Sequence, residues 1–133
     1  ILMVNALAAC EKLIIPVQTE FLAIKGLERI LNTLNMIVMT GKEQIDYVVV
    51  PTLFDRRTRA SLDSLYHLQE QYHSHLWEGY IPVDTKFREA SSLGKPASFI
   101  YPGAKGVKAY RILLKYLSVD PYVDDDVTLQ KTA

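Results

Sequence analysis

Hydrophobic positions recur three and four residues apart in two long stretches of the chain. This spacing is typical of amphipathic helices, and it predicts a helix over Glu20–Met39 and another over Arg59–Leu76. Thr19 stands where it can cap the first of these helices, and Gly41 is placed to end it. Two further helices are predicted: a short one within Asp84–Ser92, and a last one over Ala104–Ser118 with its apolar residues facing inward (Val107, Tyr110, Leu113, Leu114 and Leu117).

Short apolar runs between these stretches predict strands. Tyr47–Val50 is rich in β-branched residues and reads as a strand buried on both faces. Pro51 lacks a backbone donor, so we expect regular pairing to stop there. Leu13–Val17 and Glu78–Val83 predict two more strands, and Ala97–Tyr101 a short extended piece.

The order of these elements predicts an α/β fold. Ile1–Glu11 reads as the end of a helix, and strands and helices then alternate. Such alternation is typical of a mainly parallel sheet with helices on both faces. Three strands make a narrow sheet, so further strands are expected before Ile1 if the chain is a fragment. We expect one domain over 1–118 and an acidic, flexible tail over 119–133.

Charge is balanced overall but uneven along the chain. Fifteen basic and fifteen acidic residues cancel, so global charge favours neither nucleic acid nor membrane as a partner. The stretch 86–115 contains seven Lys or Arg and one Glu, whereas 118–133 contains four Asp and one Lys. Cys10 is the only cysteine, which indicates a packed thiol and favours a reducing, cytoplasmic setting. No apolar run reaches the roughly 18–20 residues of a membrane span.

The sequence contains no recognisable catalytic set. It lacks the glycine-rich phosphate-binding motifs, and His67, His73 and His75 are not spaced to share a metal. Polar tips do follow the three predicted strands, at Gln18–Glu20, Thr52–Asp55 and Pro82–Thr85. Because the carboxyl ends of parallel strands meet at one edge, these tips predict a crest that suits a nucleotide or another polyanion. A solvated loop with surface arginines is the alternative interpretation.

Three stretches carry a family resemblance: Ala6–Leu31, Val48–Ser61 and Tyr80–Leu117. The last contains an Ile-Pro pair, a short charged helix with Glu-Ala, a Gly-Lys-Pro and a Gly-x-x-Ala-Tyr helix. Together they resemble the carboxyl-terminal half of the ParA/Soj family of chromosome- and plasmid-partitioning ATPases, the MinD-related proteins with a deviant Walker-type P-loop. The resemblance implies a Rossmann-like P-loop fold whose phosphate cradle and Mg²⁺-binding acids lie upstream. ATP and Mg²⁺ would then belong to the intact parent, and this chain alone would be an inactive portion.

The resemblance also implies roles for particular residues. Thr52, Asp55, Pro82 and Val83 would lie near the adenine of ATP, and Gln18 and Glu20 near a homodimer interface. Lys86 matches a position that is basic in the family and implies non-specific DNA binding, with a ParB-like stimulating partner and a nucleoid-associated, cytoplasmic location. Four further cations are DNA-binding candidates by proximity alone: Arg56, Arg57, Arg59 and Arg88.

Two departures from the family pattern leave other functions open. The usual Ile-Pro-Arg-Asn is here Ile81-Pro82-Val83-Asp84, which removes a cation and adds an acid. The usual Glu-Ala-Pro-Ser-His-Gly is here Glu-Ala-Ser-Ser-Leu-Gly over 89–94. One alternative is a ParA-like ATPase that positions chemotaxis or flagellar assemblies. Another is a non-enzymatic α/β interaction module. A membrane-bound relative is disfavoured because 120–133 is acidic.

Overall fold

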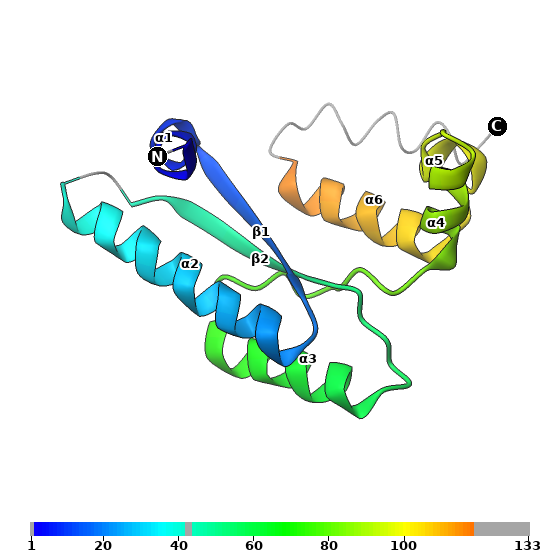
Figure 1. The fold of residues 1–133 in the computed structure, drawn as a ribbon, viewed down its shortest axis with the longest axis horizontal. Coiled ribbons are helices and arrows are strands. Elements are labelled where there is room, and N and C mark those ends of the chain that lie inside the picture. Colours follow the sequence, from blue (N-terminus) through cyan, green and yellow to red (C-terminus); the bar gives the residue numbers. More distant parts are fainter. Residues whose placement is uncertain (1, 42–43, 119–133) are drawn as a thin grey trace. The chain divides into compact units, whose positions relative to one another are not determined.

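The computed structural model describes residues 2–41 and 44–118, in two compact units that divide between Val83 and Asp84 (Figure 1). The elements of the first unit are α1 (Leu2–Ala9), β1 (Lys12–Gln18), α2 (Phe21–Met39), β2 (Asp46–Thr52) and α3 (Arg59–Tyr72). Those of the second are α4 (Thr85–Ser92), α5 (Ala97–Ile100) and α6 (Lys105–Leu117). The acidic tail predicted over 119–133 lies outside the described residues.

The first unit is built on a parallel sheet. β1 and β2 pair in parallel, with Ile15 opposite Val49, which confirms the predicted α/β class. β2 is buried from Val48 to Pro51, as its unbroken apolar run predicts. β1 instead alternates, because Ile15 and Val17 are buried while Ile14 is 47% exposed. β1 is therefore covered on one face only.

β2 continues through Pro51 to Thr52, so the prediction that Pro51 interrupts the strand is wrong. The backbone N–H of Val49 donates to His75 O (2.7 Å), and Pro51 O accepts from Ile81 N (2.9 Å). Because backbone groups alternate in direction along a strand, the nitrogen of Pro51 faces the irregular segment that contains His75 and Ile81, and not β1. Its missing donor leaves the pairing with β1 intact.

The third predicted strand, Glu78–Val83, is not a regular strand. Residues 76–83 run beside β2 and the residues that follow it, and they form two isolated parallel bridges, Leu76 with Val49 and Pro82 with Phe54. Between these bridges the chain bends around Trp77, which is 4% exposed. A side chain at Gly79 would lie 2.6 Å from the Trp77 ring, so only glycine fits this close approach. Packing of Trp77 therefore displaces the regular ladder.

Helix α2 and the two strands supply most of the core of the first unit. Nine buried apolar residues form one cluster: Leu7, Ile15, Val17, Ile24, Leu27, Leu34, Ile37, Val49 and Leu68. The helical spacing of α2 is confirmed, and Gly41 follows its end with a φ of 96° that suits glycine. α3 ends at Tyr72, four residues before the predicted Leu76, because the chain must leave the helix to pair with β2. His73 and His75 consequently lie outside the helix predicted to hold them.

The second unit packs three helices. The Asp84 carboxylate accepts from Lys86 N (2.9 Å) at the start of α4 and from Gly106 N (2.8 Å) at the start of α6. One side chain therefore ties two helix starts together. The extended piece predicted over 97–101 is wrong, since Pro96 O accepts from Phe99 N and Ile100 N and starts the short helix α5. On α6, Tyr110 and Leu114 were expected inward but are 48% and 61% exposed.

Candidate functional site

The candidate site is the edge of the sheet where three chain segments of the first unit meet. Thr19 N donates to Thr52 O (3.1 Å), which joins the tips of β1 and β2. Phe54 N donates to Ile81 O (3.1 Å), and Val83 N donates to Phe54 O (3.0 Å). The crest therefore consists of residues 18–20, 52–55 and 81–83, whereas Asp84 and Thr85 of the predicted third tip belong to the second unit. The parallel direction of all three segments puts their polar ends at one edge.

Two buried hydroxyl groups, those of Thr19 and Ser61, stabilise this crest by hydrogen bonds. The Thr19 hydroxyl lies 3.3 Å from the carbonyl oxygens of Thr52 and Leu53, and 3.4 Å from the Ser61 hydroxyl. With one proton, it donates to one of these oxygens at a time. Ser61 Oγ in turn accepts from Asp55 N (3.4 Å). Thr19 therefore supports the crest and does not cap α2, whose N-cap is Glu20 without a side-chain bond.

Sequence reasoning missed Ser61. It lies in the first turn of α3, where its N–H donates to the hydroxyl of the N-cap residue Thr58 (3.3 Å). A buried serine in a first turn is a weak sequence signal, because exposed serines are common there. Only the fold brings its hydroxyl to the crest.

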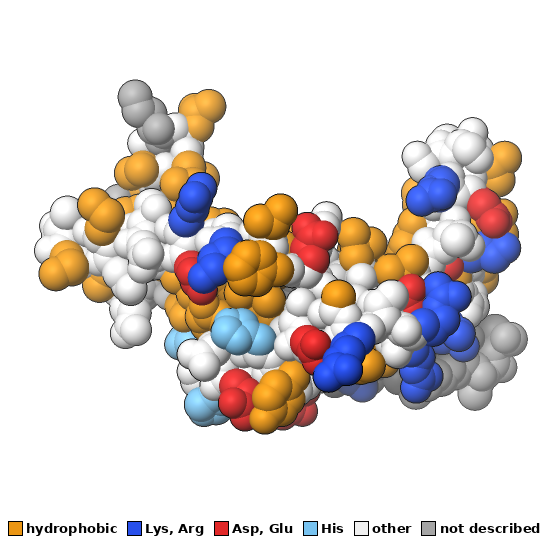
Figure 2. All heavy atoms as spheres, turned by 60° about the horizontal axis from the view of Figure 1, so that its bottom comes forward, with side chains coloured by type: hydrophobic (Ala, Val, Ile, Leu, Met, Phe, Trp, Pro, Cys, Tyr) orange, Lys and Arg blue, Asp and Glu red, His pale blue; other side chains and the backbone are white. Residues whose placement is uncertain are grey.

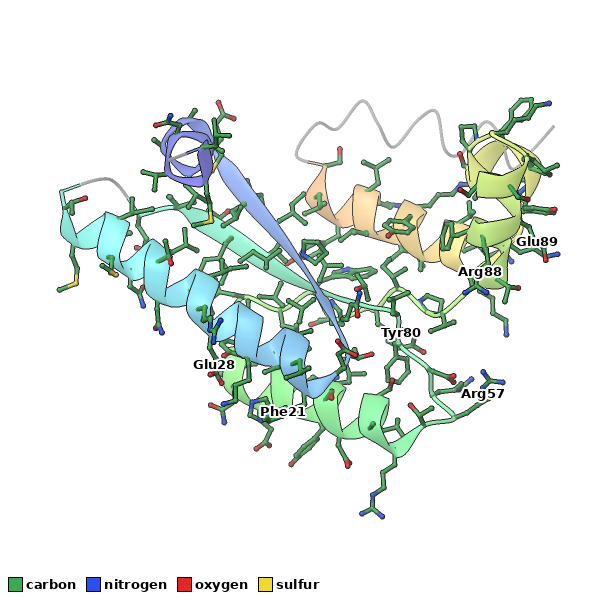
Figure 3. The ribbon with its side chains drawn as sticks, in the orientation of Figure 1. Phe21, Glu28, Arg57, Tyr80, Arg88 and Glu89 are labelled. Carbon is green, nitrogen blue, oxygen red and sulfur yellow. The ribbon has the colours of Figure 1, made fainter. Side chains whose placement is uncertain are left out.

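Asp55 and Arg57 form the strongest polar pair at the crest. Arg57 Nε and NH2 donate to the two carboxylate oxygens at 3.0 and 2.9 Å, and Arg57 N donates to Oδ1 at 3.0 Å. These bonds lower the pKa of Asp55 from 3.8 to about 2. Figure 3 shows Arg57 projecting outward from the chain. Both groups are thus charged, and each already has a partner of opposite sign.

Of the other predicted nucleotide contacts, Thr52 and Pro82 are half-buried and Val83 is 48% exposed. The Tyr80 ring lies beside them and packs on Phe54, with ring centroids 4.3 Å apart. Tyr80 is itself 36% exposed and lies near the end of β2 in Figure 3. Sequence reasoning did not single out this aromatic surface. Polar tips beside an exposed ring can bind a flat heterocycle by stacking and hydrogen bonding.

Four of the five predicted DNA-binding cations are exposed and Lys86 is half-buried, and three of the five form ion pairs with acidic side chains. Arg59 lies 3.8 Å from Asp63, and Arg56 is exposed beside it. In the second unit, Lys86 pairs with Glu89 at 3.0 Å and lies over the Tyr101 ring, whereas Arg88 is exposed. Figure 2 shows basic and acidic side chains next to each other at several places on the displayed face.

The dimer-interface candidates Gln18 and Glu20 are both exposed at the tip of β1. Within residues 2–41 and 44–118, no group of three or more His, Cys, Asp or Glu could hold a metal ion. No helix in that part of the chain is long and apolar enough to span a membrane. Cys10 is half-buried, with its thiol 3.4 Å from Leu7 O.

Comparisons with known proteins place this geometry in a class. A solved structure of cobyrinic acid a,c-diamide synthase from Mycobacterium smegmatis, with bound ADP and magnesium, matches with a TM-score of 0.59 and 27% identity. The match covers 83% of this chain and 38% of that one. An AAA-domain family model matches residues 1–47. The fold is that of P-loop NTPases.

Curated partitioning proteins are similar to most of the chain. Soj of Bacillus subtilis is 29% identical over 90% of the chain, and Soj of Thermus thermophilus is 30% identical over 84%. The cell division protein PomZ of Myxococcus xanthus is 30% identical over 86%. The resemblance to the ParA/Soj partitioning ATPases is confirmed, and the chain is a homologue of these proteins. It spans 48%, 45% and 36% of these three relatives, less than half of each.

Proposed function

We propose that this chain acts in chromosome or plasmid partitioning as part of a ParA/Soj-like ATPase. In this proposal its residues bind the base of ATP, while a P-loop segment outside the chain holds the phosphates and Mg²⁺. ATP then favours a homodimer that binds DNA without sequence preference. The observation that carries the proposal is the crest, where polar strand tips meet at the edge at which open α/β sheets bind ligands.

The crest supports a base-binding role over a phosphate-binding one. Thr52 and Asp55 offer oxygen acceptors, and Val83 and Tyr80 offer exposed apolar surface. Asp55 and Arg57 are already paired with each other, so neither offers an uncompensated charge to a phosphate. Acceptors beside an apolar surface suit the amino group and flat face of adenine.

The outer edge of β1 supports the proposal that a further part of the sheet lies beside it. Thr19 N faces β2, so the even-numbered residues of β1 direct their backbone groups away from β2. Within the described residues, no strand pairs with that edge. Open edges invite another strand. Pro16 removes one backbone donor from that edge.

DNA binding is assigned to exposed cations, chiefly Arg56 and Arg88. Lys86, Arg57 and Arg59 are further candidates, but each must first exchange a carboxylate partner for a phosphate. Exposed ion pairs contribute only about 0–1 kcal/mol, so phosphates can displace them. Arg56 and Arg88 can bind a phosphate without first giving up a carboxylate partner.

The test is DNA affinity at fixed salt, measured by fluorescence anisotropy on the natural protein that contains this chain. Binding is expected with ATP and lost with ADP. Arg56→Ala and Arg88→Ala should each weaken binding and lower the salt slope by about 1, as expected for one lost phosphate contact. Lys25→Ala is the matched control, because Lys25 is an exposed cation on α2. Equal affinity with ATP and ADP would refute the proposal.

A second candidate function is the positioning of another cell assembly, which the PomZ relative favours. A stimulating partner other than a ParB-like protein would then trigger ATP hydrolysis. Localisation of a fluorescent fusion distinguishes the two functions. Foci that follow segregating DNA support partitioning, whereas foci fixed at a division, chemotaxis or flagellar site support positioning.

A further inference from the structure

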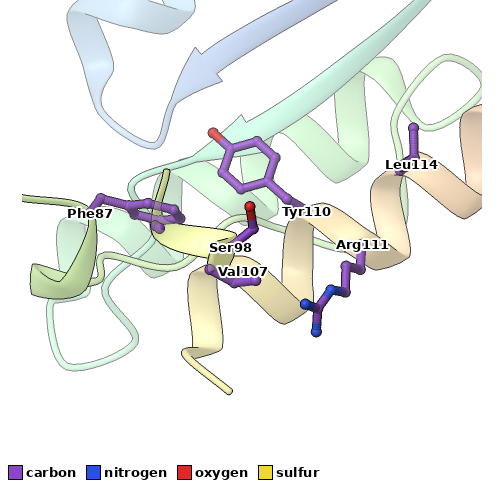
Figure 4. A pocket seen from close by; sticks show the side chains of 7 residues that line it. Phe87, Ser98, Val107, Tyr110, Arg111 and Leu114 are labelled. Atoms are coloured by element: carbon purple, nitrogen blue, oxygen red, sulfur yellow. The ribbon is translucent and has the colours of Figure 1, made fainter. Parts of the chain in front are cut away.

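The second unit contains a cavity that the proposed function does not use. Its volume is about 350 Å³, and it is lined from α4, α5 and α6 by Phe87, Ala97, Ser98, Val107, Tyr110, Arg111 and Leu114. Figure 4 shows these side chains around the cavity, with Arg111 pointing away from Tyr110. Val107 is 4% exposed, whereas Tyr110 and Leu114 are about half exposed or more. The cavity therefore has an apolar floor and an accessible rim.

The cavity is formed by well-packed elements. The Phe87 ring meets the Tyr110 ring edge-on, with centroids 5.7 Å apart. Asp84 holds the starts of α4 and α6 together through two backbone N–H groups. Arg111 donates to Pro102 O (3.0 Å), which fixes its guanidinium near the rim. A ligand would meet walls that are already in place, which lowers the entropy cost of binding.

The surroundings of the cavity are cationic. Lys108 and Lys115 lie three residues before and four after Arg111 on α6, so helical spacing puts the three cations along one side of the helix. The acids of the unit within residues 84–118 are Asp84 and Glu89, and both already accept hydrogen bonds. An occupant that combines apolar side chains with carboxylates complements this surface.

We propose that the cavity binds residues 119–133 of this same chain. That segment, which lies outside the described residues, contains Tyr122 and Val123 between Asp120 and the run Asp124–Asp126. An apolar side chain of the segment would fill the cavity, and its aspartates would face Lys108 and Arg111. The segment therefore offers apolar side chains to an apolar cavity and carboxylates to the cations beside it.

The reach of the segment fits this placement. Residues 107 and 117 are separated along α6 by about 15 Å, at 1.5 Å per residue. Five extended residues span about 17 Å, so Tyr122 can return from Leu117 to the cavity. Because the segment is tethered, its effective concentration at the cavity is about millimolar, so weak contacts suffice. Its binding would shield the cationic side of α6 from other polyanions, a consequence for DNA that rests on the proposed function.

The test uses the full 133-residue chain with a nitroxide label on Thr128→Cys in a Cys10→Ala background. Backbone amide signals of Ser98, Tyr110 and Leu114 should lose intensity, while those of α1 should not. Tyr122→Ala combined with Val123→Ala should abolish the loss, and Lys131→Ala is the matched control. Arg111→Gln should weaken it without changing the α2 signals, which report folding.

Three outcomes would overturn the proposal. Absence of any intensity loss at α5 and α6 would mean that the segment does not bind there, whether or not an external protein does. A loss that appears only when labelled and unlabelled chains are mixed would assign the cavity to a second copy. A loss that persists in the Tyr122→Ala and Val123→Ala variant would show binding by charge alone, outside the cavity. None of these outcomes depends on ATP or DNA.

Discussion

Replacing Gly106 with alanine tests the close packing of α4 against α6. A Cβ at this position would lie 2.2 and 2.5 Å from Cε2 and Cζ of Phe87, and 3.2 Å from Cβ of Asp84. The Phe87 ring must therefore move, which costs its edge contact with Tyr110, about 0.5–1.5 kcal/mol. Residual crowding adds to this cost, since overpacking typically amounts to about 1–3 kcal/mol in total.

The opposing effect is smaller. Alanine is favoured over glycine by about 1 kcal/mol in a helix interior, and by less in a first turn such as that of Gly106. We therefore expect Gly106→Ala to reduce the free energy of unfolding by about 1 kcal/mol. For a chain of this length, that lowers the thermal midpoint by about 4 °C. Circular dichroism at 222 nm measures it.

Gly26→Ala is the matched control, because nothing lies within 4 Å of a Cβ at that position of α2. It should stabilise the chain by about 0.5–1 kcal/mol. Phe87→Leu should remove most of the penalty of Gly106→Ala, giving a coupling energy of about 1 kcal/mol in a double-mutant cycle. Stabilisation by Gly106→Ala in the presence of Phe87 would refute the packing argument.

Two further predictions concern the crest. Thr19→Val should lower the free energy of unfolding by about 1–2 kcal/mol in urea denaturation, because it removes the hydroxyl that lies between two chain segments. The control is Thr33→Val, which removes a hydroxyl that bonds only within α2 and should change the free energy of unfolding by under about 0.5 kcal/mol. Equal urea midpoints for the two variants would contradict this. Asp55 should titrate near pKa 2 by NMR and near its ordinary 3.8 in Arg57→Gln. Because the pKa of Asp55 is lowered in the folded state, the stability that this pair contributes is present above pH 4 and lost as the pH falls towards 2. Arg57→Gln should make the free energy of unfolding depend less on pH in this range. An unchanged Asp55 pKa in Arg57→Gln would contradict the prediction.

Local sequence patterns predicted the main helices and the first two strands because those signals lie within a few residues of each other. The three- and four-residue spacing of α2, and the unbroken apolar run of β2, each specify an element and its burial. The crest followed from the same reasoning, since parallel strands put their ends at one edge. The resemblance to ParA/Soj proteins was equally readable, because it rests on short motifs in order.

The sequence by itself determined the α/β class, the meeting of the first two strand ends at one edge, and the resemblance to ParA/Soj proteins. Only the tertiary structure decided that Thr19 bonds a segment 33 residues away, that the third predicted strand pairs only at isolated bridges, and that Ser61 lies beside the crest. Periodicity describes which face of an element is apolar, but it carries no information on which distant group a polar side chain will meet. Those partners are set by packing of distant elements against one another, which also forms the cavity between α4, α5 and α6.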